Sequence, residues 1–285
     1  MSTKPESFAE KVIIVTGASS GIGKAVSLQL AKEGAWLALA ARDSSRLDAL
    51  ASECEHLGGK AIAIPTDVSD ECQCQNMIQV THEHYRRIDM LINNAGMSVV
   101  SKLDELPDLH LFKQVMDVNF YGMVYSTFHA LPHLKGSRGR IVNVSSLGGL
   151  QAIPYNSPYV SSKFAMNGFS DSLRMELANA SVSVTLICPY WVVTEFHERY
   201  LDKNGNPKGE AGRAIYTKDM MTAERCAEII IDAARRRKRQ VIMSPGILGM
   251  WMKLFAPDLM DRLTVQRFLK PAVKRMSEKK RHEDD

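Results

Sequence analysis

The chain lacks the features that mark secreted, membrane-spanning or metal-binding proteins. Its five cysteines are an odd number without regular spacing, which excludes a full disulfide framework and favours reduced thiols in a cytosolic protein. Cys72 and Cys74 stand too close together for an ordinary zinc site, and no Cys/His pair completes one, so no metal is expected. No run reaches the ~18 apolar residues of a transmembrane helix. We expect no signal peptide or membrane anchor at the start of the chain.

Charge of one sign is also scarce. The 36 Lys and Arg residues nearly balance the 32 Asp and Glu residues, and the net charge of +4 is too small to indicate a nucleic-acid partner. Part of the basic excess lies in "RRRKR" at 235–239 and in the tail around 274–281. What is present is ordinary for a globular protein. The chain has 285 residues, 45% of them hydrophobic, enough for one large domain with a substantial core.

Short apolar runs alternate with longer amphipathic segments as far as residue 243. Strands are expected at 11–16, 35–41, 60–65, 89–93, 139–146, 182–188 and 239–243, and helices at 21–33, 44–57, 70–87, 108–135, 155–178 and from 222. Continuous apolar strands that alternate with helices predict a doubly wound α/β fold: a parallel sheet of about seven strands, with helices on both faces. We expect residues 1–245 to form this domain, and the apolar and basic residues 246–285 to form an extension packed on or appended to it.

The segment "TGASSGIG" at 16–23 joins the first predicted strand to the first predicted helix. Its glycines, Gly17, Gly21 and Gly23, let a backbone approach a pyrophosphate closely, and the helix N-terminus offers free N–H groups. Ser19, Ser20 and Ile22 belong to the same loop. The alternative is a tight strand-to-helix turn without a ligand.

The end of the second strand bears on the choice of nucleotide. It reads Ala40-Ala41-Arg42-Asp43, so no carboxylate ends the strand to accept the ribose hydroxyls of NAD. The Arg42 guanidinium can instead clamp a 2′-phosphate, and Lys24 can add positive charge nearby. We therefore expect NADP(H) to be favoured over NAD(H), unless Arg42 is only a solvated surface residue.

Tyr159 and Lys163 stand four residues apart and would share one face of a helix. An ammonium at 4–5 Å and an effective dielectric of about 20 favours a phenolate by up to ~4 kcal/mol, and desolvation opposes this. We expect a net lowering of the pKa of Tyr159, which would suit it to move a proton to a carbonyl or from an alcohol. The spacing alone favours a chance pair on a helix surface, but Ser145 and Ser146 at a strand end favour a site.

Four motifs together resemble the short-chain dehydrogenase/reductase family. They are "TGASSGIG", "NNAG" at 93–96, "YVSSK" at 159–163 and a serine thirteen residues before the tyrosine, and the resemblance covers about residues 8–245. It implies a Rossmann fold, with Ser146 as the catalytic serine and Tyr159 as the general acid/base. It further implies that Lys163 binds the nicotinamide ribose and lowers the pKa of Tyr159, and that Asn119 holds a water linking Lys163 to solvent.

The resemblance also implies a set of cofactor contacts. Asp67 and Val68 would flank the adenine; Asn94, Ala95 and Gly96 would line the ribose; Val192 and Thr194 would contact the carboxamide end. Asp67 can alternatively be a helix N-cap, and Asn119 a polar contact inside a helix. Tyr190 departs from the family's usual Pro-Gly, so the turn is expected to adjust, with the ring at the substrate cleft or in packing.

The C-terminal part bears on substrate and partners. We expect residues 195–220 to form a lid. The residues Met243, Met250, Trp251, Met252 and Phe255 can supply an apolar pocket wall or simply pack against the core. The first reading favours a steroid-, retinoid- or lipid-like substrate, and the basic clusters and extension look similar to 11β-hydroxysteroid dehydrogenase-like members. Residues 246–285 can also lie on a membrane surface, and the tail 277–285 is expected to be disordered.

The leading hypothesis is an NADP(H)-dependent oxidoreductase that transfers a hydride between nicotinamide and a carbonyl or secondary alcohol. The resemblance implies a homodimer or homotetramer built through 108–135 and 155–178, although the extension can block one interface. Two other classes stay open: a non-catalytic, nucleotide-binding regulatory protein of the same fold, and a membrane-associated scaffold.

Overall fold

The computed structural model describes residues 6–215, 220–244 and 248–266, with side chains left out at 214–215 and 248–251. Its centre is a seven-stranded sheet in the order β3-β2-β1-β4-β5-β6-β9, and every neighbouring pair is parallel. The strands are β1 (Val12–Thr16), β2 (Trp36–Ala41), β3 (Lys60–Pro65), β4 (Met90–Asn93), β5 (Arg140–Val144), β6 (Ser183–Pro189) and β9 (Gln240–Met243). The predicted doubly wound sheet is confirmed, with each strand within two residues of its expected bounds.

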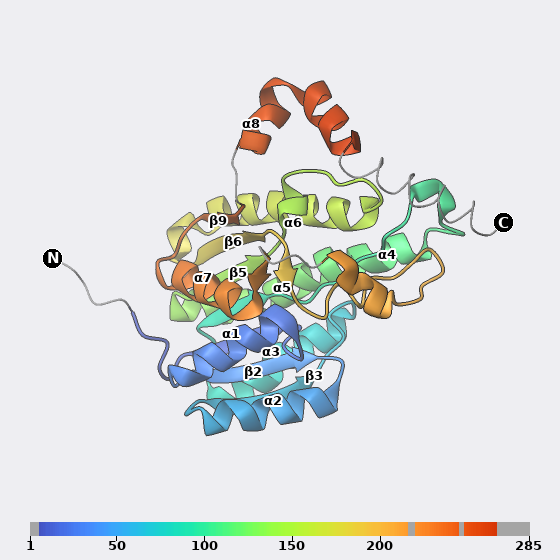
Figure 1. Ribbon diagram of the computed structural model, residues 1–285. Coiled ribbons are helices and arrows are strands. Elements are labelled where there is room, and N and C mark those ends of the chain that lie inside the picture. The colour runs from blue at the N-terminus through green and yellow to red at the C-terminus, as the bar shows by residue number, and fades with distance from the viewer. Residues whose placement is uncertain (1–5, 216–219, 245–247, 267–285) are drawn as a thin grey trace.

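Helices cover both faces of the sheet, as Figure 1 shows. One face carries α1 (Gly21–Lys32), α2 (Ser44–His56) and α7 (Ala223–Arg235), and the other carries α3 (Glu71–Tyr85), α4 (His110–Met116), α5 (Gly122–Ser137) and α6 (Ser157–Glu176). Shorter elements connect them: β7 (Val192–Val193) pairs with β8 (Met221–Thr222), and 3-10 turns include η3 (Leu147–Gly149) and η5 (Gly209–Ile215).

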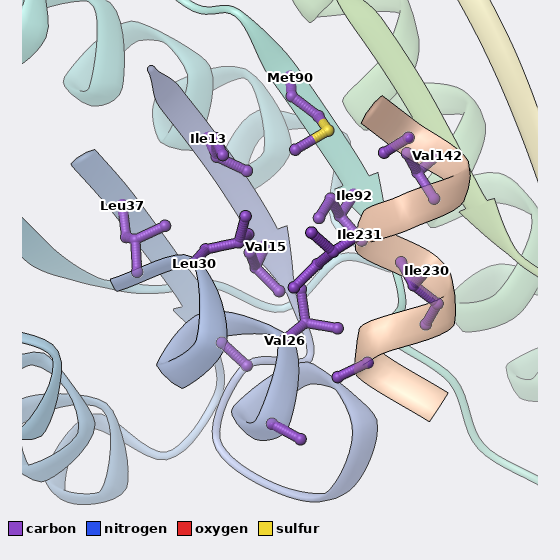
Figure 2. Close-up of a cluster of buried hydrophobic side chains, with 14 of the residues drawn as sticks. Ile13, Val15, Val26, Leu30, Leu37, Met90, Ile92, Val142, Ile230 and Ile231 are labelled. Atoms are coloured by element: carbon purple, nitrogen blue, oxygen red, sulfur yellow. The ribbon is translucent and has the colours of Figure 1, made fainter. Parts of the chain in front are cut away.

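The two hydrophobic clusters follow from the alternation of side chains along each strand. In β1, Ile13 and Val15 point to the side of α1 and α7, whereas Ile14 points to the side of α3 and α5. Figure 2 shows the first cluster, in which Ile230 and Ile231 of α7 close over the strands. Each such fully buried side chain contributes ~1.5–3 kcal/mol. Apolar residues on both strand faces thus hold the sheet between two helical layers.

The long helix predicted for 108–135 is interrupted. A π-helical turn, Asp117–Tyr121, separates α4 from α5 and contains the buried Asn119. Such a wider turn changes the direction of the side chains that follow, and it is frequent at functional sites. Because the i→i+5 pattern carries no apolar periodicity of its own, the sequence predicted an uninterrupted helix.

The C-terminal segment leaves the sheet after β9 and forms α8 (Leu248–Phe255), followed by helical residues 257–266 (Figure 1). Lys253 ties it to the domain: its Nζ donates to the Leu150 carbonyl at 2.8 Å and lies 4.4 Å from the centre of the Phe164 ring on α6. Leu254 and Phe255 are 72% and 79% exposed. The division at residue 245 stays a prediction, and residues 277–285 lie outside the described residues.

All five cysteines are free thiols; Cys72 is exposed and the other four are buried. Among the helices of residues 6–266 that the structure describes, none combines the length and apolar composition needed to cross a bilayer.

Candidate active site

A cavity of about 720 Å³ opens at the carboxyl ends of the parallel strands. It straddles β1 and β4, where the chain reverses its direction of winding and where open α/β sheets bind their ligands. Its wall contains sixteen of the eighteen predicted site residues, namely Gly17, Ser19, Ser20, Gly21, Ile22, Arg42, Asp67, Val68, Asn94, Ala95, Gly96, Ser146, Tyr159, Lys163, Val192 and Thr194. The other two, Gly23 and Asn119, lie behind the wall.

The glycine loop has the shape that a diphosphate requires. Gly17 has φ +65°, and a Cβ there would lie 2.8 Å from the Ala95 Cα. Gly23 lies one layer deeper, and its Cβ would lie 2.3 Å from the Gly17 carbonyl oxygen. The Ser20 side chain does not cap α1, so the first N–H groups of this helix keep no side-chain cap and face the cavity. Backbone of this kind fits the diphosphate of a dinucleotide.

Asn94 fixes the loop from the neighbouring strand. Its Nδ2 donates to the carbonyl oxygens of Thr16 and Gly17 at 3.0 and 3.2 Å. The Thr16 Oγ1 in turn accepts from the N–H groups of Asn94 and Ala95 at 3.0 and 3.1 Å. The ends of β1 and β4 are therefore locked together under the cavity.

At the adenosine end, Arg42 is exposed, and no hydrogen bond or ion pair joins it to another residue of the described chain. Lys24 does not line the cavity, and its ammonium pairs with Glu53 at 2.9 Å, so it makes no contact with the site of the kind expected. Asp43 caps α2 and accepts from the Arg46 N–H at 3.0 Å. The Asp43 carboxylate is therefore already engaged.

Asp67 lies at the wall beside Val68, as expected. Its Oδ1 accepts from the N–H and the hydroxyl of Ser69 at 3.0 and 2.7 Å. The N-cap of α3 is Asp70, so the alternative that Asp67 caps this helix is wrong.

The fold brings Ser146, Tyr159 and Lys163 to one part of the wall. Ser146 follows β5 and its Oγ accepts from the Gly148 N–H at 3.0 Å. Tyr159 and Lys163 lie one turn apart on α6, which begins with Ser157 and Pro158, a residue suited to a first turn. The Lys163 Nζ donates to the carbonyl of Val144, the last residue of β5, at 3.0 Å. This bond holds α6 against the strand that carries Ser146.

The electrostatics of the pair differ from the expectation. Burial raises the pKa of Tyr159 to about 12, and the Ser146 hydroxyl offsets only part of this rise. Burial also lowers the pKa of Lys163 to about 8. The predicted lowering of the Tyr159 pKa is therefore wrong for the nucleotide-free protein. Desolvation opposes the charged form of both groups, and the ammonium lies over the ring face rather than beside the hydroxyl.

Asn119 acts as a clamp between two segments. Its Oδ1 accepts from the Met97 N–H at 2.8 Å, and its Nδ2 donates to the Met97 carbonyl and to the Ser162 Oγ at 3.0 and 2.9 Å. The Ser162 hydroxyl donates to the Tyr159 carbonyl at 2.7 Å. This is the polar contact considered as the alternative to a role in proton transfer, and it fastens α6 to the segment after β4.

Tyr190 keeps its φ outside the left-handed region, so the turn adjusts as expected. The ring is 37% exposed, borders the cavity and packs edge-on against Trp191. Val192 is buried and pairs with Met221. A Cβ added at Gly21 would lie 3.2 Å from the Thr194 side chain, so Thr194 closes over the glycine loop. The substitution of the usual glycine therefore adds an aromatic group to the cavity mouth.

An aromatic wall was missed by the sequence reasoning. Trp191, Phe196, His197 and Tyr200 line the cavity, and the Phe196 ring lies 6.1 Å from that of Tyr159. Burial lowers the pKa of His197 to about 4, which leaves it neutral. The i, i+4 spacing of Phe196 and Tyr200 was an available signal. The alternative that the methionine-rich segment forms a pocket wall is wrong for Met243, Met252 and Phe255, because none of the three lines the cavity. Met243 packs in the core instead. The side chains of Met250 and Trp251 lie outside the described part of the structure.

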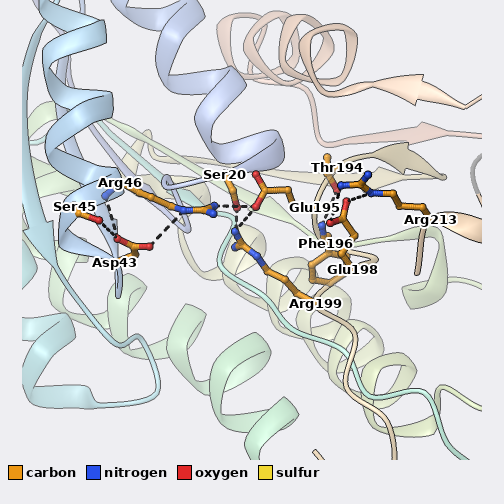
Figure 3. A network of polar contacts seen from close by, with 10 residues as sticks. All are labelled: Ser20, Asp43, Ser45, Arg46, Thr194, Glu195, Phe196, Glu198, Arg199 and Arg213. Atoms are coloured by element: carbon orange, nitrogen blue, oxygen red, sulfur yellow. Dashed lines mark hydrogen bonds and ion pairs between the residues drawn. The ribbon is translucent and has the colours of Figure 1, made fainter. Parts of the chain in front are cut away.

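A chain of charges runs along the cofactor side of the predicted lid (Figure 3). Glu195 accepts from Arg46 of α2 at 2.8 Å and from Arg199 at 2.5 Å, and Arg199 also donates to the Ser20 Oγ at 3.0 Å. Sequence reasoning missed this network as well. The i, i+4 spacing of Glu195 and Arg199 was an available signal for their ion pair. No local pattern indicates the contact between Glu195 and Arg46, which are 149 residues apart.

Comparisons with known proteins agree with this geometry. The chain is 35% identical over 266 residues to 11-beta-hydroxysteroid dehydrogenase A of Sesamum indicum, which covers 90% of this chain and 75% of that protein. It is 34% identical over 278 residues to 11-beta-hydroxysteroid dehydrogenase-like 2 of Arabidopsis thaliana, covering 95% and 86%. The fold matches a short chain dehydrogenase/reductase from Burkholderia phymatum, solved in complex with NAD, with a TM-score of 0.80, 27% identity and coverage of 89% and 96%.

A protein-family model described as short chain dehydrogenase matches residues 11–205, more than half of the chain. Relatives above 30% identity and the matching fold point the same way. The chain therefore belongs to the short-chain dehydrogenase/reductase family of oxidoreductases.

Proposed function

We propose that this oxidoreductase uses NADP(H) to interconvert an apolar ketone or aldehyde and the corresponding alcohol. The observation that carries the proposal is the convergence of Ser146, Tyr159 and Lys163 on a cavity that begins at the glycine loop. A non-catalytic nucleotide-binding protein would have no need to bury a lysine beneath a tyrosine and a serine at the same wall.

The chain's residues fit a dinucleotide along the whole cavity. The loop from Gly17 to Gly23 would hold the diphosphate, with Asp67 and Val68 at the adenine and Asn94, Ala95 and Gly96 at the ribose. Val192 and Thr194 would hold the carboxamide end, and Lys163 the nicotinamide ribose. When bound, a nicotinamide supplies or accepts the hydride.

In the reducing direction, Tyr159 gives its hydroxyl proton to the oxygen of the substrate carbonyl. Tyr159 is protonated at neutral pH and so carries the proton that the reduction needs, although the pKa raised by burial makes it a weaker acid than a free tyrosine. The Ser146 hydroxyl donates a hydrogen bond to the same carbonyl oxygen and orients it. Lys163 offsets the negative charge that remains on Tyr159. A water held by Asn119 would link Lys163 to solvent, so that Lys163 can pass a proton to Tyr159 and regain one from the water.

The preference for NADP(H) is supported by Arg42. Its guanidinium faces the cavity without a partner among the described residues, and the neighbouring Asp43 is engaged as a helix cap. A free guanidinium favours a phosphate, and an engaged carboxylate accepts ribose hydroxyls poorly. The Burkholderia relative binds NAD, so the preference is a property proposed for this chain.

The aromatic wall supports an apolar substrate. The cavity is lined by Tyr190, Trp191, Phe196 and Tyr200, and the Phe196 ring lies 6.1 Å from the ring of Tyr159. Flat rings bury large apolar area at little cost in conformational entropy. The names of the plant relatives, hydroxysteroid dehydrogenases, point to the same steroid-, retinoid- or lipid-like class.

For location and assembly we propose a cytoplasmic homodimer or homotetramer. We propose that it contacts anionic membranes through its C-terminal arm, by which we mean α8 and the helical residues that follow it, 248–266. The arm exposes Leu254, Phe255, Leu259 and Leu263, a row that can enter a lipid interface. Exposed Phe128 and Met175, on α5 and α6, suit the subunit contact. Because Lys253 of the arm already covers part of Phe164 on α6, the arm borders that surface.

The experiment that tests the proposed function is NADPH consumption against a panel of steroids, retinal, quinones and short aliphatic ketones. The expected result is turnover with the larger apolar carbonyls. No turnover with any of them would contradict the proposal.

A further inference from the structure

One carboxylate oxygen holds two guanidinium groups at the edge of the cofactor cavity. The Oε2 of Glu195 accepts from the Nη1 of Arg46 at 2.8 Å and from the Nη2 of Arg199 at 2.5 Å (Figure 3). Arg46 belongs to the first turn of α2, whereas Glu195 and Arg199 belong to the segment after β7. The bond therefore joins the lid to the helix that follows Arg42.

Both guanidinium groups lie on the cavity wall, and Glu195 does not. Arg46 shares the adenosine end of the wall with Arg42. Arg199 lies at the diphosphate end, because its Nη1 donates to the Ser20 Oγ at 3.0 Å, and Ser20 precedes α1. Glu195, which lies outside the cavity wall, thus binds two guanidinium groups that a nucleotide in the cavity would contact.

The local charges nearly cancel. Arg46 contacts a second carboxylate, Asp43, at 3.4 Å, so two guanidinium groups are balanced by Asp43 and Glu195. All four side chains are about half exposed, so the pairs are weak enough to exchange for another anion. The hydrogen bonds and charge of Arg46 hold the pKa of Glu195 below its usual range, so the carboxylate is ionised at neutral pH.

We propose that Glu195 competes with the 2′-phosphate of the nucleotide for Arg46 and thereby sets how strongly the protein prefers NADP(H) to NAD(H). The inference rests on the proposed use of NADP(H). Arg42 is the permanent phosphate ligand, and Arg46 is a second ligand that becomes available only at the expense of its bond with Glu195. The carboxylate weakens phosphate binding both by occupying the guanidinium and by adding negative charge beside it.

Competition works in both directions, because coupling between two binding events is reciprocal. A 2′-phosphate that draws Arg46 away loosens the tie between the lid and α2. The other side of the lid is held by backbone bonds: the Leu201 N–H donates to the Ser98 carbonyl at 3.0 Å, and the Val100 N–H donates to the Leu201 carbonyl at 2.9 Å. NAD(H), which lacks the phosphate, leaves both sides of the lid tied.

The lid provides a matched control. Glu198, three residues further on, binds the guanidinium of Arg213 with both oxygens, at 2.8 and 3.2 Å. Neither residue belongs to the cavity wall. Glu198→Gln therefore removes a carboxylate from the same segment without changing the charge on Arg46.

The test is the dissociation constant of NADPH and of NADH for the wild type, Glu195→Gln and Glu198→Gln, read from the fluorescence of Trp191 at the cavity wall. We expect Glu195→Gln to bind NADPH about two- to fivefold more tightly than the wild type, a factor that corresponds to one exposed charge pair. NADH should bind nearly as it does to the wild type, because the hydrogen bond to Ser20 still holds Arg199 at the diphosphate end. Glu198→Gln should change neither. Equal changes for both nucleotides, weaker NADPH binding or no change in Glu195→Gln would overturn the inference.

Two further measurements separate this result from the proposed function. Adding Arg46→Gln to Glu195→Gln should remove the gain in NADPH affinity, and a gain that persists without Arg46 would also overturn the inference. Wild-type turnover with NADPH and a ketone tests the proposed function independently. If the wild type turns over a ketone but Glu195→Gln changes the affinity for both nucleotides equally, the role of Glu195 is rejected and the proposed reaction is not. If Glu195→Gln changes only the affinity for NADPH but the wild type shows no turnover, the proposed reaction is rejected and the role of Glu195 is not.

Discussion

The ammonium nitrogen of Lys163 lies 5.6 Å from the centre of the Tyr159 ring and is fixed there by the carbonyl at the end of β5. A positive group stands ready for the charge that Tyr159 acquires when it gives up its proton. Burial, which raises the pKa of Tyr159 to about 12, keeps the phenol protonated until then. The site is therefore prepared for protonation of a carbonyl, and the reverse reaction requires that Tyr159 first lose its proton.

The first prediction concerns ionisation. In the nucleotide-free protein, Tyr159 should remain protonated through neutral pH and titrate near 12, because burial disfavours the phenolate. Nuclear magnetic resonance of isotope-labelled tyrosine, with the signal assigned by Tyr159→Phe, measures this directly. A Tyr159 signal that shifts between pH 6 and 8 (the neutral range) would show that Lys163 outweighs desolvation.

The second prediction concerns the glycine loop. Gly23→Ala should lower the free energy of unfolding by about 1–3 kcal/mol and weaken nucleotide binding, because the added Cβ meets the Gly17 carbonyl oxygen. Gly168→Ala on α6 is the control: no atom lies near its Cβ, so the fold should gain about 0.5–1 kcal/mol and bind nucleotide normally. Chemical denaturation and nucleotide titration measure both effects. Normal binding by Gly23→Ala would contradict the assigned diphosphate site.

The third prediction concerns the choice of nucleotide. Arg42→Ala should weaken NADPH binding by about ten- to a hundredfold, the value of a charge-assisted hydrogen bond, and leave NADH binding nearly unchanged. Arg236→Ala is the control, since Arg236 is exposed, pairs with Asp232 and lies away from the cavity. Titration of both nucleotides checks this. Unchanged NADPH affinity in Arg42→Ala would show that Arg42 is only a surface residue.

The fourth prediction concerns the C-terminal arm. Wild-type protein should float with vesicles that contain anionic lipid, and the double change Leu254→Glu and Leu263→Glu should abolish this, since each apolar side chain contributes ~1.5–3 kcal/mol when buried. Leu103→Glu, an equally exposed leucine on the catalytic domain, should have no effect. Recovery of the wild type solely in the soluble fraction would refute membrane contact.

The sheet and most of the cavity wall could be predicted from sequence because they depend on local patterns. Val12–Thr16 and Trp36–Ala41 are continuous apolar runs, and a glycine-rich turn between a strand and a helix admits few geometries. The residues at the carboxyl ends of such strands then meet at one edge of the sheet. This is why Ser146 could be assigned to the site from its place after a strand, whereas Asn94 and the pairing of Ser146 with Tyr159 followed from the resemblance to the family.

What the sequence did not reveal depends on contacts between distant segments or on the balance of opposing terms. The π-helical turn at Asn119 has no periodic signal, and the partner of Lys24 is a glutamate 29 residues away. The pKa of Tyr159 depends on how far burial outweighs the nearby ammonium, and only the packed structure fixes this. The bond between Arg46 and Glu195 likewise joins segments that no local pattern connects.

In the proposed NADPH-dependent reduction, Tyr159 donates the proton to the substrate carbonyl. The most direct measurement compares NADPH consumption by the wild type, Tyr159→Phe and Tyr85→Phe with an apolar ketone. Tyr85 is buried away from the cavity and donates a hydrogen bond to the Leu37 carbonyl. Loss of this hydrogen bond in Tyr85→Phe should lower the free energy of unfolding by about 1 kcal/mol and leave turnover unchanged. Tyr159→Phe should bind NADPH as the wild type does and turn over roughly 10²–10⁴-fold more slowly. Turnover by Tyr159→Phe at the wild-type rate would contradict this role of Tyr159.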